Sequence, residues 1–180
     1  YSARRVQDIF SQFMRIAQEL GLNIAQEKIT PENIARCILS GFSDQLARRM
    51  DTGTARCEMV HNRKGNLSRN SAVRKSELFV AGEITELGVR GEELEIQLSM
   101  ATAVKREYLH EFFPTDFEAR RSVEWDESLK KAVCRIEQCF RGLVIEKKYG
   151  QDTDIEESSL ILAEQLMKGN LKLNLWDHNV

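Results

Sequence analysis

The fold is decided by residues 78–100, LFVAGEITELGVRGEELEIQLSM. From Glu93 to Met100, polar and apolar residues alternate, which is the two-residue period of a strand with one buried face. Leu78 to Leu87 is a second candidate strand, and Gly88-Val89-Arg90-Gly91 between them is typical of a turn. The stretch therefore predicts a β-hairpin in the middle of the chain.

Upstream of this hairpin, the apolar residues follow a helical period. Between residues 6 and 20 they recur every three to four positions, and Gly21 is a typical residue just past a helix end. A second helix is expected to begin at Thr30-Pro31, because threonine can cap it and proline is tolerated at its first position. Its apolar stripe predicts a helix as far as residue 50, and it consists of Ile34, Ile38, Phe42, Leu46 and Met50. Arg48 and Arg49 would lie in the last turn.

Further short elements surround the hairpin. A candidate strand at 56–61 is followed by the polar, basic loop Asn62–Asn66. Downstream, the sequence predicts a helical or mixed stretch at 102–113, a strand at 122–126 and a turn at 127–130. A long extended run at 132–149 is expected to bend at Gly142. A helix should run from the capping-box pattern at 153–156 to Gly169, and a closing strand should follow at 171–176.

Together these elements predict an α+β fold: N-terminal helices, then a small OB-like β-barrel with an intervening helical stretch and a terminal helix. We expect residues 1–53 to form a helical segment and residues 54–180 to form the barrel domain.

Composition favours a globular protein. The chain has 180 residues, 42% hydrophobic and 30% charged, and no run approaches the roughly 18 apolar residues of a membrane span. The four cysteines show no CxxC pair, so free thiols in a cytoplasmic protein are expected. We expect no membrane partner. The N-terminus shows no signal peptide, and the absence of an initiator Met suggests a piece of a longer chain.

The sequence contains no recognisable catalytic signature. It has no GxxxxGK[ST] phosphate loop and no GxSxG motif, and its three histidines share no metal-ligand spacing. We therefore expect no catalytic residue, cofactor or metal in this chain by itself.

Charge is unevenly distributed. Residues 1–76 contain 13 Lys and Arg against 7 Asp and Glu, whereas residues 77–180 contain 13 against 21. Residues 48–75 carry eight of the positive charges. This basic stretch is either a phosphate-contacting surface or simply a solvated basic surface, and Asn62–Asn66 combines hydrogen-bond donors with a glycine that would let a backbone approach.

The order of these features resembles the DEAH/RHA helicase family. Residues 34–49, IARCILSGFSDQLARR, look like the last helix of its ratchet domain. Four later stretches resemble the bacterial HrpB-type branch. Val60–Gly65 is similar to its ANGRG loop, and Leu78–Ile84 is similar to its LVAAEL strand. Val123–Ile145 resembles its V-x-W-D…R…LGxLxL run, and Leu175-Trp176 resembles its LPW end. The chain departs from that pattern where Arg63 replaces the glycine after asparagine, and where no proline precedes Trp176.

The resemblance implies an accessory region of an ATP-dependent RNA helicase that holds single-stranded RNA or another nucleic acid beside motor lobes absent from this chain. Those lobes would bind ATP and Mg²⁺. The alternative is a protein-interaction or scaffold module that docks on the motor lobes or on a cofactor protein. The nucleic-acid-binding residues implied by the matching loop, or suggested by charge and proximity, are Arg48, Arg49, His61, Asn62, Arg63, Lys64, Gly65, Arg69, Arg74 and Lys75.

Overall fold

A computed structural model describes residues 2–22, 29–51, 53–90, 93–150 and 154–171. The chain forms two compact units, residues 1–34 and 35–180. The first contains α1 (Ser2–Glu19), the predicted amphipathic helix, and Gly21 follows it with a φ of +67°. None of the described helices is both long and apolar enough to cross a membrane.

Helix α2 (Pro31–Gly41) begins where predicted, and the Asn33 amide donates to Thr30 Oγ1 at 3.2 Å. The prediction that it continues to residue 50 is wrong. After a 3₁₀ turn, residues Leu46–Arg49 form strand β1. Leu46 and Ala47 are both fully buried, one in each of two separate clusters, which a strand achieves by pointing successive side chains to opposite faces. The strand therefore lies within the segment predicted to be helical.

Five strands close a barrel in the order β1-β2-β3-β5-β4: β1, β2 (Arg56–Met59), β3 (Arg63–Leu67), β4 (Leu78–Arg90) and β5 (Glu93–Ala103). All neighbours are antiparallel except β3 and β5, which are parallel. This confirms the predicted α+β fold with a small OB-like barrel. The barrel interior is filled by Ala47, Cys57, Met59, Leu67, Phe79, Ala81 and Leu98.

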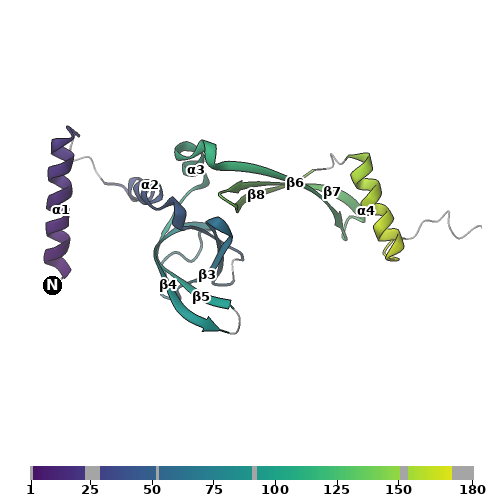
Figure 1. The fold of residues 1–180 in the computed structure, drawn as a ribbon, viewed down its shortest axis with the longest axis horizontal. Coiled ribbons are helices and arrows are strands. Elements are labelled where there is room, and N and C mark those ends of the chain that lie inside the picture. Colours follow the sequence, from purple (N-terminus) through teal and green to yellow (C-terminus); the bar gives the residue numbers. More distant parts are fainter. Residues whose placement is uncertain (1, 23–28, 52, 91–92, 151–153, 172–180) are drawn as a thin grey trace, which may run out of the picture. The chain divides into compact units, whose positions relative to one another are not determined.

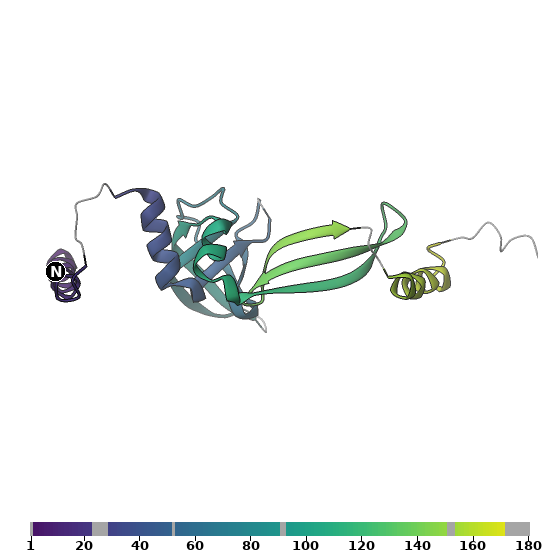
Figure 2. The ribbon, with the colours of Figure 1, turned by 90° about the horizontal axis from the view of Figure 1, so that it is seen from above.

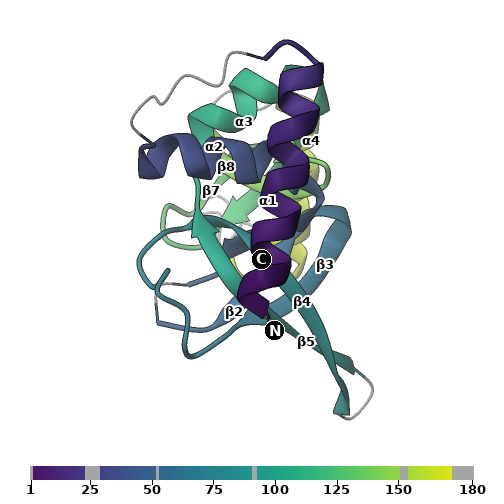
Figure 3. The same ribbon diagram turned by 90° about the vertical axis from the view of Figure 1, so that its left-hand side faces the viewer.

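The predicted hairpin is β4 and β5, paired from Phe79↔Ala103 to Arg90↔Glu93. Figure 3 shows it running on beyond the barrel body. The prediction of a turn at 88–91 is wrong for residues 88–90, which belong to β4, and Gly91 lies outside the described residues.

Downstream, three strands form a second sheet rather than part of the barrel: β6 (Phe117–Asp126), β7 (Lys131–Phe140) and β8 (Leu143–Gly150). Figure 2 shows them as long neighbouring ribbons. The predicted turn at 127–130 joins the first two. The predicted bend at Gly142 is instead a two-residue turn, since Arg141 and Gly142 both have positive φ (46° and 84°), as type I′ hairpins require.

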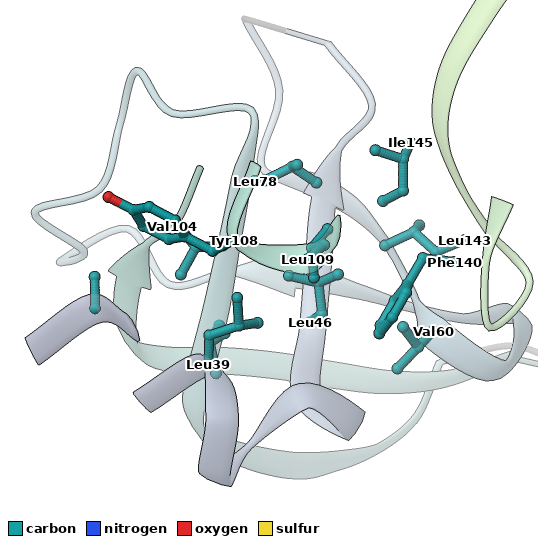
Figure 4. Close-up of a cluster of buried hydrophobic side chains, with 12 residues drawn as sticks. Leu39, Leu46, Val60, Leu78, Val104, Tyr108, Leu109, Phe140, Leu143 and Ile145 are labelled. Atoms are coloured by element: carbon teal, nitrogen blue, oxygen red, sulfur yellow. The ribbon is translucent and has the colours of Figure 1, made fainter. Parts of the chain in front are cut away.

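A hydrophobic cluster joins the outer face of the barrel to the elements around it. Leu46 and Val60 of the barrel side meet Leu39 of α2, Leu109 of α3 (Arg106–Phe112) and Phe140 at the end of β7 (Figure 4). All five are completely or almost completely buried. This second core fixes one end of the three-stranded sheet against the barrel.

The terminal helix α4 (Ile155–Met167) packs on β6 and β7 (Figure 1). Its cap is Asp154, whose side chain accepts from the Glu156 amide at 3.1 Å. Arg121 Nη1 on β6 lies 2.7 Å from Glu157 Oε2 on the helix. Gly169, with a φ of +76°, follows the helix as predicted. The predicted closing strand lies almost entirely outside the described residues.

Candidate nucleic-acid interface

The β2–β3 connection is shorter than the predicted loop Asn62–Asn66. A 3₁₀ turn, Val60–Asn62, makes the reversal, and β3 already begins at Arg63. His61 and Asn62 adopt left-handed φ values of 61° and 56°. Asparagine tolerates this region better than most residues. The loop prediction is therefore wrong for residues 63–66, which are paired with β2.

Gly65 has a packing role in this arrangement. It pairs with Cys57 of β2, and a Cβ at this position would lie 3.2 Å from both the Ile96 carbonyl oxygen and Leu98 Cγ on β5. Glycine thus allows β3 and β5 to approach closely.

The outward face of β1, β2 and β3 carries two rows of side chains. In the first row, Arg48, Glu58 and Lys64 are neighbours across the three strands. Arg48 Nη2 lies 3.0 Å from Glu58 Oε2, so this arginine is neutralised locally. Lys64 is exposed and forms no ion pair within the described ranges.

The second row lies two residues further along the strands. Arg56 pairs with Asn66, and the Met50 amide donates to the Arg56 carbonyl at 3.0 Å. Arg56 is exposed and Asn66 is half-buried. Sequence analysis did not select Arg56, although it lies within the basic stretch 48–75. The outward face of β1–β3 is defined here as these two rows.

A groove lies between the β2–β3 turn and the second sheet. Its cavity volume is about 210 Å³, and we call it the hairpin groove; its lining is Glu58, Met59, Asn62, Arg63, Lys64, Arg120, Gly142, Leu143 and Val144. Three cationic side chains thus border it against one acidic side chain. It brings the predicted residues Asn62, Arg63 and Lys64 together with a strand some sixty residues downstream.

Arg120 of β6 is the member of this groove that sequence analysis missed. Its guanidinium is 2.8 Å from Glu118 Oε1 on the same strand, and this hydrogen bond is the main reason that the pKa of Arg120 is raised. The residue is exposed and stays charged at any physiological pH, although Glu118 offsets part of that charge, as Glu58 does for Arg48. No local signal marks it, because Arg120 belongs to the acidic half of the chain and reaches the groove only through the tertiary fold.

Two predicted arginines mainly hold the backbone. Arg63 donates from Nη2 to the Asp44 carbonyl at 2.5 Å and from Nε to the Val60 carbonyl at 3.4 Å. Arg49 donates to the Val73 carbonyl at 2.9 Å. Guanidinium groups have five N–H donors, so these bonds still leave donors free. His61 is exposed, and its amide donates to the Arg141 carbonyl at 2.9 Å.

The remaining predicted residues lie at a second place, beside the connection between β3 and β4. A cavity of about 420 Å³, called here the connection cleft, is lined by Arg49, Met50, Asp51, Arg74, Lys75, Ser76 and Glu77. Arg74 donates to the Arg69 and Ser71 carbonyls, which shapes the connection. The Arg69 side chain is exposed and does not line the cleft.

Arg141 anchors the second sheet beside the hairpin groove. Its guanidinium binds Asp116 Oδ2 through Nε (2.7 Å) and Nη2 (2.6 Å), and Nη1 donates to the Ser43 hydroxyl at 2.9 Å. The guanidinium also lies over the rings of Phe113 and Phe140, 5.2 and 5.0 Å from their centroids. The β7–β8 turn is thereby fixed to the barrel, which determines where Arg120 can lie.

Comparison with known proteins supports the fold. No model of a known protein family matches the chain, and no curated protein matches it. Among solved structures, the chain is similar to an Escherichia coli DExH-box NTPase, HrpB, with a TM-score of 0.56 and 16% identity over 87% of this chain. The chain shares the fold of part of HrpB.

A second structure, described as the Escherichia coli DEAH/RHA helicase HrpB, gives a TM-score of 0.54 with 17% identity over 80% of this chain. The chain spans only 19% and 17% of the lengths of these two HrpB chains. The resemblance to the HrpB-type branch that the sequence motifs indicated is therefore confirmed at the level of fold.

Proposed function

We propose that this chain is an accessory nucleic-acid-binding region of an ATP-dependent RNA helicase, and that it holds single-stranded RNA on the outward face of β1–β3 and in the hairpin groove. The observation that carries the proposal is that Lys64 and Arg120 border one groove, although Arg120 comes from a separate sheet, and that Arg56 lies one row from Lys64 on the outward face. In OB-type barrels, the face of strands 2 and 3 is the usual site for oligonucleotides.

The chemistry of this face favours phosphate over bases. Apart from Glu58, which is paired with Arg48, its outward side chains are cationic or amide groups, and no aromatic residue occurs in β1, β2 or β3. Stacking on aromatic rings gives each base about 1–3 kcal/mol in other single-strand binders. Without it, affinity would come from the release of counterions by lysine and arginine, and binding would depend steeply on salt.

In the proposed setting, motor lobes elsewhere in the protein would bind ATP and Mg²⁺ and hydrolyse the nucleotide. This chain would stay bound to the RNA strand between translocation steps. We place the whole protein in the cytoplasm. A weak, sequence-tolerant grip suits that role, because a translocating strand must slide past it.

Salt-dependent binding of a fluorescent single-stranded RNA tests the proposal. Removing one cation that binds a phosphate should lower the salt slope by about 0.7 and the affinity about fivefold at 0.1 M salt. We expect K64Q/R120Q, which removes two such cations, to lower the slope by about 1.4 and the affinity about 25-fold.

The matched control is K130Q/K148Q. It also removes two exposed cations, each paired with a neighbouring glutamate, one in the 127–130 turn and one on β8, both outside the groove lining. The control should behave as wild type. An equal loss of RNA affinity in both double variants would show that only net charge matters. If the wild-type chain bound no RNA at low salt, the scaffold alternative would be favoured.

A further inference from the structure

We propose that the connection cleft is a second phosphate-binding subsite for the same RNA strand, so that the strand lies diagonally across β3, β2 and β1. The inference rests on the proposed function, and it adds a path and a footprint. The hairpin groove would take one end of the bound segment, and the cleft would take the other.

Met50 links the two places. It follows directly after β1, its amide bonds to the Arg56 carbonyl, and it also lines the cleft. The second row of the outward face therefore continues into the cleft. Lys64 lies on β3, two strands away from β1, and one row away from Met50. The separation is about 10 Å across the sheet and about 7 Å along the strands. An RNA strand that contacts Lys64 and then Arg56 would therefore continue past Met50 into the cleft.

The charges in the cleft favour an anion. Lys75 is exposed and forms no ion pair among the described residues. Arg74 is held by two carbonyls of its own connection, so its guanidinium is preorganised and keeps three further N–H donors. Of the two acids in the lining, Glu77 lies 3.5 Å from the Arg106 guanidinium of α3. Asp51 is then the one acid set against the lining cations Arg49, Arg74 and Lys75.

A polyanion is a better fit to this cleft than a single small anion. The cleft is bordered mostly by exposed side chains, and it contains a carboxylate that would repel a lone phosphate. A strand already held in the hairpin groove brings its next phosphates to the cleft at high effective concentration, so even a weak contact adds affinity.

Binding to a length series of oligouridylates tests this inference. The probes are rU2, rU4, rU6 and rU8, titrated at 0.1 M salt into the whole chain. We expect wild-type affinity to rise from rU2 to about rU6, beyond the rise from the number of binding registers, since OB-type barrels take about four or more nucleotides.

Lys75→Gln should leave rU2 binding unchanged and weaken rU8 binding about fivefold, the effect of removing one phosphate-binding cation. Lys148→Gln is the single-charge control, and R74Q/K75Q should weaken rU8 binding further. Thermal melting of each variant checks that it is folded.

Two results would overturn the second subsite: K75Q binding both lengths like wild type, or K75Q weakening both lengths equally. In either case K64Q/R120Q would still reduce binding, so the proposed function would survive. If wild-type protein bound no oligouridylate at low salt, both proposals would fail together.

Discussion

Arg141 binds one carboxylate oxygen of Asp116 with two nitrogens, Nε at 2.7 Å and Nη2 at 2.6 Å. Both side chains are a little more than a quarter exposed. The pair connects the β7–β8 turn to the segment before β6, and the Ser43 hydroxyl ties it to the residues before β1. This contact therefore holds the second sheet where Arg120 can border the hairpin groove.

Removing this contact should destabilise the protein. Charge-assisted hydrogen bonds contribute about 1.5–3 kcal/mol each, so we expect R141A to lower the free energy of unfolding in urea by about 2–3 kcal/mol. A double-mutant cycle with D116A should give a coupling energy above about 1 kcal/mol.

The exposed pair Arg121–Glu157 provides the comparison, since such surface pairs couple by less than about 1 kcal/mol. A coupling between Arg141 and Asp116 no larger than that of Arg121 and Glu157 would show that the anchor is an ordinary surface contact.

Gly65 provides a second prediction, because its role differs between sequence and structure. G65A places a methyl group 3.2 Å from the Ile96 carbonyl, and overpacking of this kind costs about 1–3 kcal/mol. We expect a lower melting temperature but an unchanged RNA affinity per folded molecule. A variant with full stability and no RNA binding would instead support the phosphate-loop interpretation.

How far the sequence predicts the fold depends on how well each pattern separates helix from strand. The hairpin β4–β5 was predictable because strict alternation over eight residues fits only a strand. Helix α2 was predicted too long, because its four-residue spacing also fits alternate positions of a strand. Leu46 and Met50 fit both the helical and the strand pattern, and only the burial of Ala47 between them distinguishes strand from helix.

The candidate site shows a similar division. Lys64 was recognisable from local charge, but β3 was not, because its sequence RKGNL is polar outside and has only Gly65 and Leu67 to face inward. Arg120 carries no local signal at all. The separate second sheet was also missed, since the turn at Arg141-Gly142 interrupts what looks like one continuous apolar run.

The thiols should differ sharply in reactivity. Cys37 is exposed, whereas Cys57, Cys134 and Cys139 are buried. Burial raises the pKa of the Cys57 and Cys139 thiols, which keeps them protonated. With Ellman's reagent at neutral pH we expect one fast thiol, abolished by C37S, and three that react only on unfolding. Rapid reaction of two or more thiols in the C37S protein would contradict the buried positions.

These raised pKa values also predict a pH dependence. The folded state holds the two thiol protons more tightly than the unfolded chain, whose cysteines ionise near pH 8.5. The stability from these groups is therefore complete below about pH 8.5 and decreases as the pH rises beyond it. Urea midpoints between pH 7 and 10 should fall for wild type and fall less for C57A.

Base identity should matter little to RNA binding. Because the outward face of β1–β3 offers cations and an amide but no aromatic ring, it can contact the sugar–phosphate backbone without stacking on bases. Affinities for rU8, rA8 and rC8 at equal salt should agree within about threefold. A preference of one hundredfold for any of them would require a base-reading site that this face does not contain.

Amide chemical-shift mapping of the labelled protein with rU8 tests the central claim most directly. Shifts are expected at Arg56–Met59, at the β2–β3 turn with Arg63–Leu67, and around Arg120, because these segments form the proposed face. The amides of α4 and of the 127–130 turn should stay unchanged at the same RNA concentration. Shifts confined to α4 and that turn, with none along β2 and β3, would contradict the account.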